Sequence, residues 1–290
     1  MPKVVDGHLH LFQKVSADYP RTPLAIMAEA SREEIAEKLL DAMEGAGVDH
    51  AIVVPLSKGD DYLSEVLARF PGRFAGVGIF DHDQPDDVAG VEARLATTDL
   101  QGLRFYGLAA DEDTTLGSLA CLPVFELMAE RGMVVWFYGD IVQLRLMGQV
   151  MRHLPALRVV LNHSGFLPDM HAEMRIDEYR RPHFDVDLPP AGLPAVEVMA
   201  SEHPNLHVHF SGQYAFSSEK YPYRDIQGVA ERVLAAFGAD RMLMASDWPW
   251  IEFEPGYTKI LGVLDQLLPN LSATERDAIR GGTALSLFRF

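Results

Sequence analysis

Two histidines near the start of the chain have the spacing of a metal-binding pair. His8 and His10 lie in and just after the apolar run Val4–Leu9, which the pattern predicts to be a strand, and Asp6 precedes them. Because side chains alternate along a strand, we expect Asp6, His8 and His10 to share one face. Neutral imidazoles at positions i and i+2 can bind one divalent cation. Two hydrogen-bonded histidines without a metal are the alternative.

Further polar side chains end two later apolar runs. Asp247 comes directly after the last of these runs, and His163 ends the sixth. In a closed barrel the last strand lies beside the first, so Asp247 would meet His8 and His10 at one rim. A carboxylate beside two imidazoles can ligate a metal or take a proton from water. We therefore expect Asp247 and His163 to be catalytic. A divalent metal, zinc by preference, would be held by His8, His10 and Asp247.

Eight runs rich in Val, Ile, Leu and Phe recur along the chain, each followed by polar or glycine-rich residues and a helical pattern. Such runs are typical of strands buried on both faces. The spacing between them leaves room for a crossover helix each time. This predicts an α/β protein in which residues 1–290 form one (β/α)₈ TIM barrel domain. The runs are Val4–Leu9, Ala51–Pro55, Phe74–Phe80, Leu100–Tyr106, Met133–Tyr138, Arg158–His163, Leu206–Ser211 and Arg241–Ser246.

Two segments carry the signature of a helix start. Ser31–Glu34 reads as a capping box ahead of the stripe Ile35, Leu39 and Met43. Ser272–Glu275 repeats the pattern, and we expect Gly281 and Gly282 to end the helix that it opens. An open doubly wound sheet is the alternative architecture, but no G-x-G-x-x-G motif follows a strand.

Side chains at the ends of other predicted strands are candidates for binding a substrate. Arg104 and Tyr106 share one face of the fourth run, and a guanidinium pairs well with a carboxylate or carbonyl. A nearby Asp or Glu as structural partner is the alternative for Arg104. Tyr138, His209 and Trp250 lie at the same expected mouth. For His209, a hydrogen-bonded place in the core is the alternative.

Composition restricts the class of partner. The chain has 42 acidic and 25 basic residues and a net charge of −17. Nucleic acid and anionic membranes require a positive surface and are therefore not expected partners. The expected partner is a small molecule, which an arginine-rich mouth would select for negative charge. Arg175, Arg180 and Arg181 of the stretch Ser164–Pro190 are candidates for that mouth. A homo-oligomer is left open.

The cysteine content and the first residues bear on location. Cys121 is the single cysteine, which excludes an intramolecular disulfide. No basic and apolar leader precedes the first predicted strand, and no apolar span is long enough to cross a membrane. We therefore expect a cytoplasmic protein.

Four short motifs carry a family resemblance: Asp6-Gly-His8-Leu-His10, Asn162-His163-Ser-Gly165, Phe210-Ser-Gly212 and Ala245-Ser-Asp247-Trp-Pro249. Together they resemble the amidohydrolase superfamily, especially the amidohydrolase-related branch with the sugar-lactone hydrolases and 2-pyrone-4,6-dicarboxylate lactonase. The resemblance spans almost the whole chain. It implies a distorted barrel, with His8 and His10 at the first-strand metal positions, His163 at the position of the family's sixth-strand histidine, and Asp247 as the residue that deprotonates water.

One departure from that family concerns the fifth strand. Met133–Asp140 has no histidine or lysine, where many relatives supply a metal ligand. Metal-dependent and metal-independent catalysis are therefore both compatible with the chain. We expect a hydrolase that opens a small lactone of a sugar acid or a dicarboxylate. The alternatives are a metal-dependent decarboxylase or C–C hydrolase of the same superfamily, and a non-catalytic barrel that binds a ligand.

Overall fold

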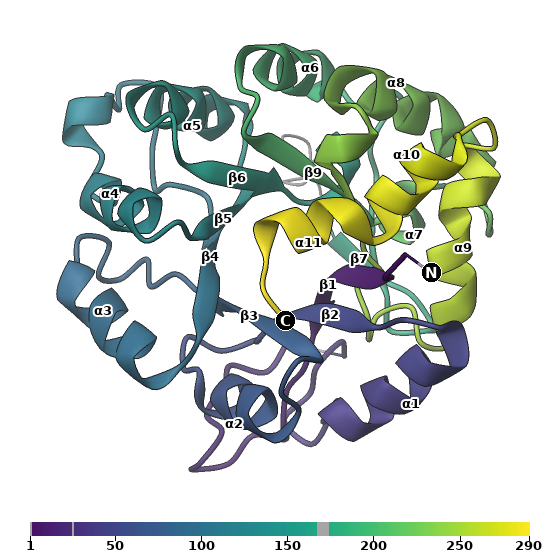
Figure 1. Ribbon diagram of the computed structural model, residues 1–290, viewed down its shortest axis with the longest axis horizontal. Helices are drawn as coiled ribbons and strands as arrows, with labels where there is room; N and C mark the ends of the chain where they lie inside the picture. Colours follow the sequence, from purple (N-terminus) through teal and green to yellow (C-terminus); the bar gives the residue numbers. More distant parts are fainter. Residues whose placement is uncertain (1, 25, 167–173) are drawn as a thin grey trace.

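Eight parallel strands form a barrel at the centre of the molecule (Figure 1). The computed structural model describes residues 2–24, 26–166 and 174–290. Neighbouring barrel strands follow chain order, and an antiparallel ribbon of β7 (Met174–Ile176) and β8 (Pro182–Phe184) lies between β6 and β9 in the sequence. The barrel strands are β1 (Val5–His10), β2 (His50–Val54), β3 (Phe74–Ile79), β4 (Leu100–Tyr106), β5 (Val134–Tyr138), β6 (Arg158–Leu161), β9 (Leu206–Phe210) and β10 (Met242–Met244).

The ring of strands closes between β10 and β1. Just beyond β10, the Asp247 amide donates to the His8 carbonyl at 3.0 Å, and the His10 amide donates to the Trp248 carbonyl at 2.8 Å. Gly7 permits this approach, because a Cβ atom at that position would lie 2.8 Å from the Met244 carbonyl oxygen. We call these contacts the barrel seam. The barrel seam joins the first strand to the last. The predicted (β/α)₈ barrel is therefore confirmed.

Helices surround the strands (Figure 1). None of those in the described ranges is both long and apolar enough to cross a membrane. The short α11 lies over the middle of the barrel in Figure 1, and Ala284 and Leu287 join the apolar cluster inside it. The helices are α1 (Ala36–Ala46), α2 (Asp61–Arg69), α3 (Val88–Thr97), α4 (Leu122–Glu130), α5 (Ile141–His153), α6 (Leu193–Glu202), α7 (Gln213–Phe216), α8 (Gln227–Phe237), α9 (Tyr257–Leu267), α10 (Ala273–Asp277) and α11 (Thr283–Leu287).

The strands are buried on both faces, as their apolar sequences predict. Inside the barrel, the six strands other than β4 and β9 share one cluster with α11 and Phe288, and this cluster includes Val5, Trp136 and Leu243. Outside it, the opposite faces of the strands pack against the helices in a larger cluster. Two apolar layers therefore hold the strand ends in fixed positions, and those ends carry the polar residues described below.

The helix boundaries differ from the sequence prediction at two of three points. Ser272 and Glu275 form the predicted capping box of α10. The box predicted at Ser31 is wrong, because α1 begins at Ala36 and the backbone of Glu34 instead pairs with Phe12. The predicted break at Gly281 is also wrong. The chain continues there through a π-helical turn, where the glycine lets the Lys3 carbonyl approach closely.

The face of β1 also differs from the prediction. The pairing of β1 with β2 shifts by one residue between Asp6 and Leu9, which is a β-bulge. Val5 therefore points into the barrel, while Asp6 accepts a hydrogen bond from Tyr257 of α9 at 2.9 Å. The expectation that Asp6 shares a face with the two histidines is wrong, because simple alternation does not hold across a bulge.

Candidate active site

Asp247 stands at the barrel seam, three residues beyond the end of β10. Its side chain is buried and its φ is +60°. This left-handed conformation is costly for a residue other than glycine and persists only where surrounding contacts enforce it. The backbone hydrogen bonds to His8 and His10 across the seam are such contacts. The fold therefore places one carboxylate, in a strained conformation, between the ends of β1 and β10.

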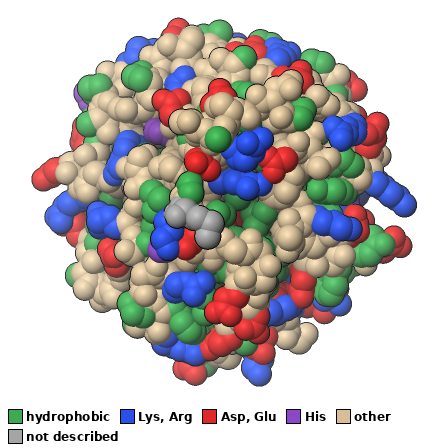
Figure 2. Space-filling model, turned by 45° about the vertical axis from the view of Figure 1, so that its right-hand side comes forward, with side chains coloured by type: hydrophobic (Ala, Val, Ile, Leu, Met, Phe, Trp, Pro, Cys, Tyr) green, Lys and Arg blue, Asp and Glu red, His purple; other side chains and the backbone are tan. Residues whose placement is uncertain are grey.

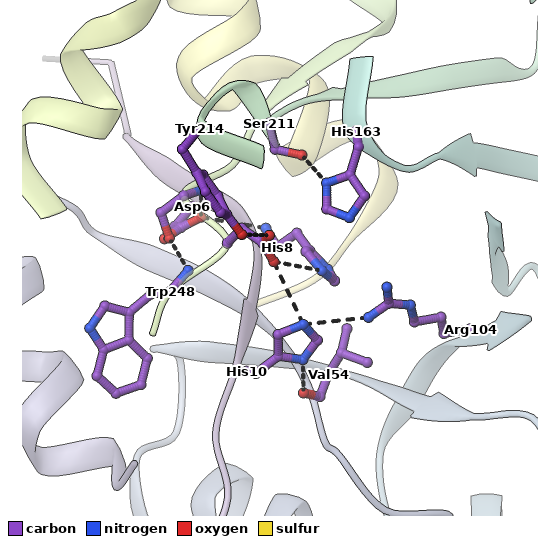
Figure 3. Close-up of polar contacts among 11 residues, drawn as sticks. Asp6, His8, His10, Val54, Arg104, His163, Ser211, Tyr214 and Trp248 are labelled. Atoms are coloured by element: carbon purple, nitrogen blue, oxygen red, sulfur yellow. Dashed lines mark hydrogen bonds and ion pairs between the residues drawn. The ribbon is translucent and has the colours of Figure 1, made fainter. Parts of the chain in front are cut away.

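Both oxygens of the Asp247 carboxylate have defined neighbours. Oδ1 lies 3.5 Å from His8 Nε2 and 3.6 Å from His10 Nε2. Oδ2 accepts a hydrogen bond from the Tyr214 hydroxyl at 2.6 Å. Figure 3 shows Tyr214, His8 and His10 converging on this point. Burial raises the pKa of Asp247, and this rise is opposed by His10, Tyr214 and Arg104. One oxygen is thus anchored, and the other faces two imidazoles.

The histidines of β1 are neutral bases. His10 Nδ1 lies 3.0 Å from the Val54 carbonyl, which can only accept, so the proton is on Nδ1 and Nε2 keeps its lone pair. Burial, reinforced by Arg104, lowers the pKa of His10 to about 4 and that of His8 well below its usual value. Neither ring nitrogen of His8 makes a hydrogen bond to a described residue.

Arg104, at the end of β4, brings a fixed positive charge to the same place. Its Nη1 lies 3.4 Å from His10 Nε2, and its guanidinium stacks over the Tyr106 ring at 4.5 Å. The side chain is buried, and no carboxylate of the described residues forms an ion pair with it. The alternative of a structural Asp or Glu partner therefore finds no support in the described ranges. A buried cation of this kind attracts a carbonyl or carboxylate.

The remaining predicted residues divide into two groups. His163, Tyr106, Tyr138 and Trp250 line the cavity above Asp247. The Nδ1 atom of His163 hydrogen bonds with the Ser211 hydroxyl at 3.1 Å, and burial lowers its pKa to about 3.

His209 differs from these residues. It is fully buried and lies against His8 and Trp136, with ring centroids 5.3 and 4.6 Å away. It is absent from the lining of the cavity. In this structure the His209 ring packs against other residues of the site, and its predicted contact with a substrate stays a prediction.

The cavity is small and opens at the ends of the strands where Asp247 and the histidines lie. Its volume is about 190 Å³. Polar groups gather at its base, where Asp247, His10 and Arg104 meet, and carbon-rich side chains form the rest of the wall. This is the form of a site for a small molecule, with a few convergent polar groups in an apolar surround.

The comparison with protein families agrees with this arrangement. A family model described as amidohydrolase matches residues 5–290. The chain belongs to the amidohydrolase family. This confirms the superfamily expected from the motifs and, with it, the prediction of a hydrolase. The amidohydrolase is similar to L-fucono-1,5-lactonase from Burkholderia ambifaria, with 26% identity over 257 residues, which are 84% of this chain and 80% of that protein.

Solved structures share the fold of this amidohydrolase. An amidohydrolase from Burkholderia multivorans with bound zinc has a TM-score of 0.73 at 22% identity, covering 98% of both chains. A putative 2-pyrone-4,6-dicarboxylic acid hydrolase from Pseudomonas putida has a TM-score of 0.72 at 21% identity, over 99% of this chain and 97% of that one. A dihydroxybenzoic acid decarboxylase from a Polaromonas species, with bound manganese, reaches 0.67 at 15%, over 99% and 97%. At these identities the likeness establishes the fold alone.

His8, His10 and Asp247 fit a divalent cation. One ligand atom from each lies within 4.8 Å of the others, and all three residues are buried. The free nitrogens of His8 and the lone pair on His10 Nε2 are suitable donors, and two histidines with one carboxylate match a catalytic zinc site with an open position. The Arg104 charge beside His10 opposes the fit in part, because like charges repel. β5 contributes Trp136 and Tyr138 to this region, and neither is a histidine or lysine.

Tyr214 is the member of the site that the motifs did not reveal. It lies in α7, 33 residues before its partner Asp247. The sequence shows only a tyrosine-rich loop after the seventh predicted strand, and nothing in that loop distinguishes Tyr214 from Tyr221 and Tyr223. Its position two residues after Gly212, close in the chain to the Ser211 hydroxyl that contacts His163, is the one available signal.

The arginines expected at the mouth lie elsewhere. Arg175 and Arg181 line a neighbouring cavity of about 810 Å³. Arg175 pairs with Asp185 at 2.6 Å and Arg181 with Asp177 at 2.8 Å, so their charges are neutralised. Arg180 is exposed and lines neither cavity.

The prediction of an arginine-rich mouth is therefore wrong for these three residues. Residues 167–173 of the same stretch lie outside the described part of the chain. Basic and acidic side chains are interspersed on the face seen in Figure 2.

Proposed function

We propose that this amidohydrolase opens a small lactone with Asp247 as the general base. The observation that carries the proposal is the Asp247 carboxylate itself, held by Tyr214 on one oxygen and open to the two histidines and the cavity on the other. Its raised pKa suits a group that must accept a proton and return it within one turnover. The similarity to a fuconolactonase supports the same reaction.

Hydrolysis of a lactone requires three actions at this site. Arg104 binds and polarises the carbonyl oxygen of the ring ester and stabilises the negative charge that develops on it. Asp247 takes a proton from water while the water oxygen attacks the carbonyl carbon. The bond between that carbon and the ring oxygen then breaks, and the proton passes from Asp247 to the ring oxygen. The product is an open-chain hydroxy acid.

The neutral histidines and Tyr138 complete the site. Burial raises the pKa of Tyr138 to about 12, so its hydroxyl stays protonated and can donate to a substrate oxygen. His8, His10 and Asp247 would hold a divalent cation, which supplies Lewis-acid polarisation of the carbonyl when it is bound. His163, hydrogen bonded to Ser211, contributes a further imidazole to the lining of the cavity.

A decarboxylase is the second candidate, because a decarboxylase with bound manganese shares the fold. Loss of carbon dioxide from an arene acid would need a firmly held cation to accept electrons, and the described site offers three ligands beside a fixed positive charge. The lactone reaction requires no more than the residues described here. A barrel that only binds a ligand is the third candidate, and the strained, fully oriented Asp247 argues against it.

A panel of lactones and arene acids tests the proposal. We expect acid release from at least one lactone, followed with a pH indicator, and no release of carbon dioxide from any acid. Metal analysis of the purified protein and assays after treatment with a chelator show whether a bound cation contributes. Carbon dioxide release without hydrolysis of any lactone would replace the proposal with the decarboxylase.

A further inference from the structure

The walls of the cavity are mostly hydrocarbon. Nine of the sixteen described residues that line it are apolar, among them Met27, Leu56, Phe184, Phe216 and Trp250. The lining residues in the described ranges include no Ser, Thr, Asn, Gln, Glu or Lys. Those side chains are among the ordinary partners of ligand hydroxyl groups. The composition of the wall therefore disfavours a ligand that carries many hydroxyls.

Several of the polar groups in the lining already have partners within the protein. The Tyr214 hydroxyl donates to Asp247, and one nitrogen each of His10 and His163 is bonded to the protein. Arg104 and Asp247 are needed at the reacting ester group. A hydroxyl moved from water into such a wall without a partner loses binding energy. Several such hydroxyls on one ring would add their losses.

The rim of the cavity is apolar as well, although it is exposed to solvent. Leu24 is 41% exposed, Tyr106 46% and Met174 50%. They come from three separate parts of the chain, the segment after β1, the end of β4 and the start of β7, and all three border this cavity. Exposed apolar side chains gathered around an opening mark a binding site for an apolar group.

From these observations, and resting on the proposed lactonase function, we infer that the substrate is a single-ring lactone with an apolar substituent, aliphatic or aromatic, and not a polyhydroxylated sugar lactone. The cavity of about 190 Å³ is smaller than the roughly 300–1,000 Å³ of pockets for drug-sized ligands, so it suits one ring with a short substituent. Arg104 is the single Lys or Arg in the described lining and pairs with the ring ester or with one carboxylate beside it.

Two matched lactones test this inference. δ-Hexalactone has the ring and methyl group of L-fucono-1,5-lactone but none of its hydroxyls. For each lactone, kcat/KM is divided by the rate constant of spontaneous hydrolysis. We expect this ratio to be at least about tenfold higher for δ-hexalactone than for L-fucono-1,5-lactone. This is the order of discrimination that an apolar pocket achieves against hydroxyl groups. An equal or higher value for L-fucono-1,5-lactone overturns the inference and leaves lactone hydrolysis intact.

Binding separates this inference from the proposed function. The corresponding lactams, 6-methyl-2-piperidone and L-fucono-1,5-lactam, carry a ring amide that resists opening, so their dissociation constants can be measured by calorimetry whatever the reaction. Tighter binding of 6-methyl-2-piperidone supports the inference even if no lactone is opened, in which case the proposed function fails alone. Equal or tighter binding of the hydroxylated lactam, or binding of neither, overturns the inference.

Substitutions at the rim give a second, independent measurement. Leu24→Gln and Met174→Gln change exposed side chains and so leave the core unaltered. We expect each to reduce the preference for δ-hexalactone by about two- to fivefold. Val198→Gln is the matched control, because Val198 is 54% exposed on α6 and does not border the cavity. If both rim variants kept the preference for δ-hexalactone unchanged, the rim would not contribute to substrate selection.

Discussion

Asp6 and Asp247 are both buried aspartates at the barrel seam, yet their surroundings differ. Asp6 lies on the outer side of β1, where its carboxylate accepts hydrogen bonds from the Ser246 amide at 2.8 Å, the Ser246 hydroxyl at 2.5 Å and Tyr257 at 2.9 Å. Burial raises its pKa to about 6, and these hydrogen bonds lower it again in part. Each donor is part of the protein, so no capacity is left for a ligand.

Asp247 lies on the other side of the same seam with one donor, Tyr214, and with Oδ1 directed at the histidines. Its burial is similar to that of Asp6. The difference lies in hydrogen-bond capacity. A buried carboxylate whose bonds all come from the protein holds the backbone together, whereas one with a spare oxygen above a cavity can act on a substrate. Four substitutions test this division, from the largest expected effect to the smallest.

Asp247→Asn should remove catalysis without harming the fold. We expect kcat to fall by at least about 10³-fold, the contribution of a general base, because an amide cannot take a proton from water. Tyr214 can still donate to the amide oxygen, so the melting temperature should stay the same or rise. Asp83→Asn, at an exposed aspartate paired with Lys58, is the matched control. Substantial activity in Asp247→Asn would refute the role of base.

Asp6→Asn should show the reverse pattern. The NH₂ group of the asparagine can only donate, and it would face the hydroxyl and amide donors of Ser246 and Tyr257. Because these donors would lose an acceptor, we expect the free energy of unfolding to fall by about 1–3 kcal/mol. Denaturant titration measures this change. Activity should fall by less than in Asp247→Asn, since Asp6 acts on the site only by holding Ser246 and the residue after it. A variant of normal stability but without activity would erase the distinction between the two aspartates.

Tyr214→Phe tests the anchor on Asp247. The Tyr214 hydroxyl stabilises the ionised carboxylate and so lowers its pKa. Removing the hydroxyl raises that pKa, and because the base must be ionised, the acid limb of the kcat/KM profile should move to higher pH. We expect about a tenfold loss of kcat/KM near that limb from the lost hydrogen bond. Tyr221→Phe, outside the cavity lining, is the control. An unshifted acid limb would exclude electrostatic coupling of Tyr214 to the base.

Tyr257→Phe should have the smallest effect. It removes one of the donors to Asp6 and leaves both bonds from Ser246. We expect a loss of about 1 kcal/mol in the free energy of unfolding and a kcat within about twofold of the parent. Comparison with Tyr214→Phe makes this informative, since both variants lose a single tyrosine hydroxyl. A larger fall in kcat for Tyr257→Phe would place Asp6 in the catalytic machinery.

Most of the barrel could be predicted because each strand is marked by a pattern of residues that are adjacent in the sequence. Each strand is an apolar run, and the predicted and observed strands overlap throughout, from Val4–Leu9 against β1 (Val5–His10) to Arg241–Ser246 against β10 (Met242–Met244). The positions of His8, His10 and Asp247 at one rim followed from closing the ring. Errors came from features without a local pattern. The bulge in β1 moved Asp6 to the outer face, and Glu34 paired with Phe12 in place of capping a helix.

The electrostatic detail of the site was harder to predict for the same reason. In the sequence, Arg175 and Arg181 cannot be distinguished from an arginine that binds a substrate. Only the fold shows that Asp185 and Asp177 neutralise their charges. Conversely, Arg104 is a single arginine in an apolar strand, and its lack of a carboxylate partner in the described ranges becomes visible only when the strands are assembled. Partners distant in the chain decide which charges remain available.

The seam has a consequence for how the active protein forms. Ser246 and Asp6 are separated by 240 positions, and the contacts between His8, His10 and Asp247 join the same distant segments. Contacts of such long range carry a large entropic cost of loop closure and form late in folding. Partly folded chains can therefore hold most of their helices and strands while lacking the site entirely. During refolding, activity reports closure of the ring, and it should return after the circular dichroism signal of the helices.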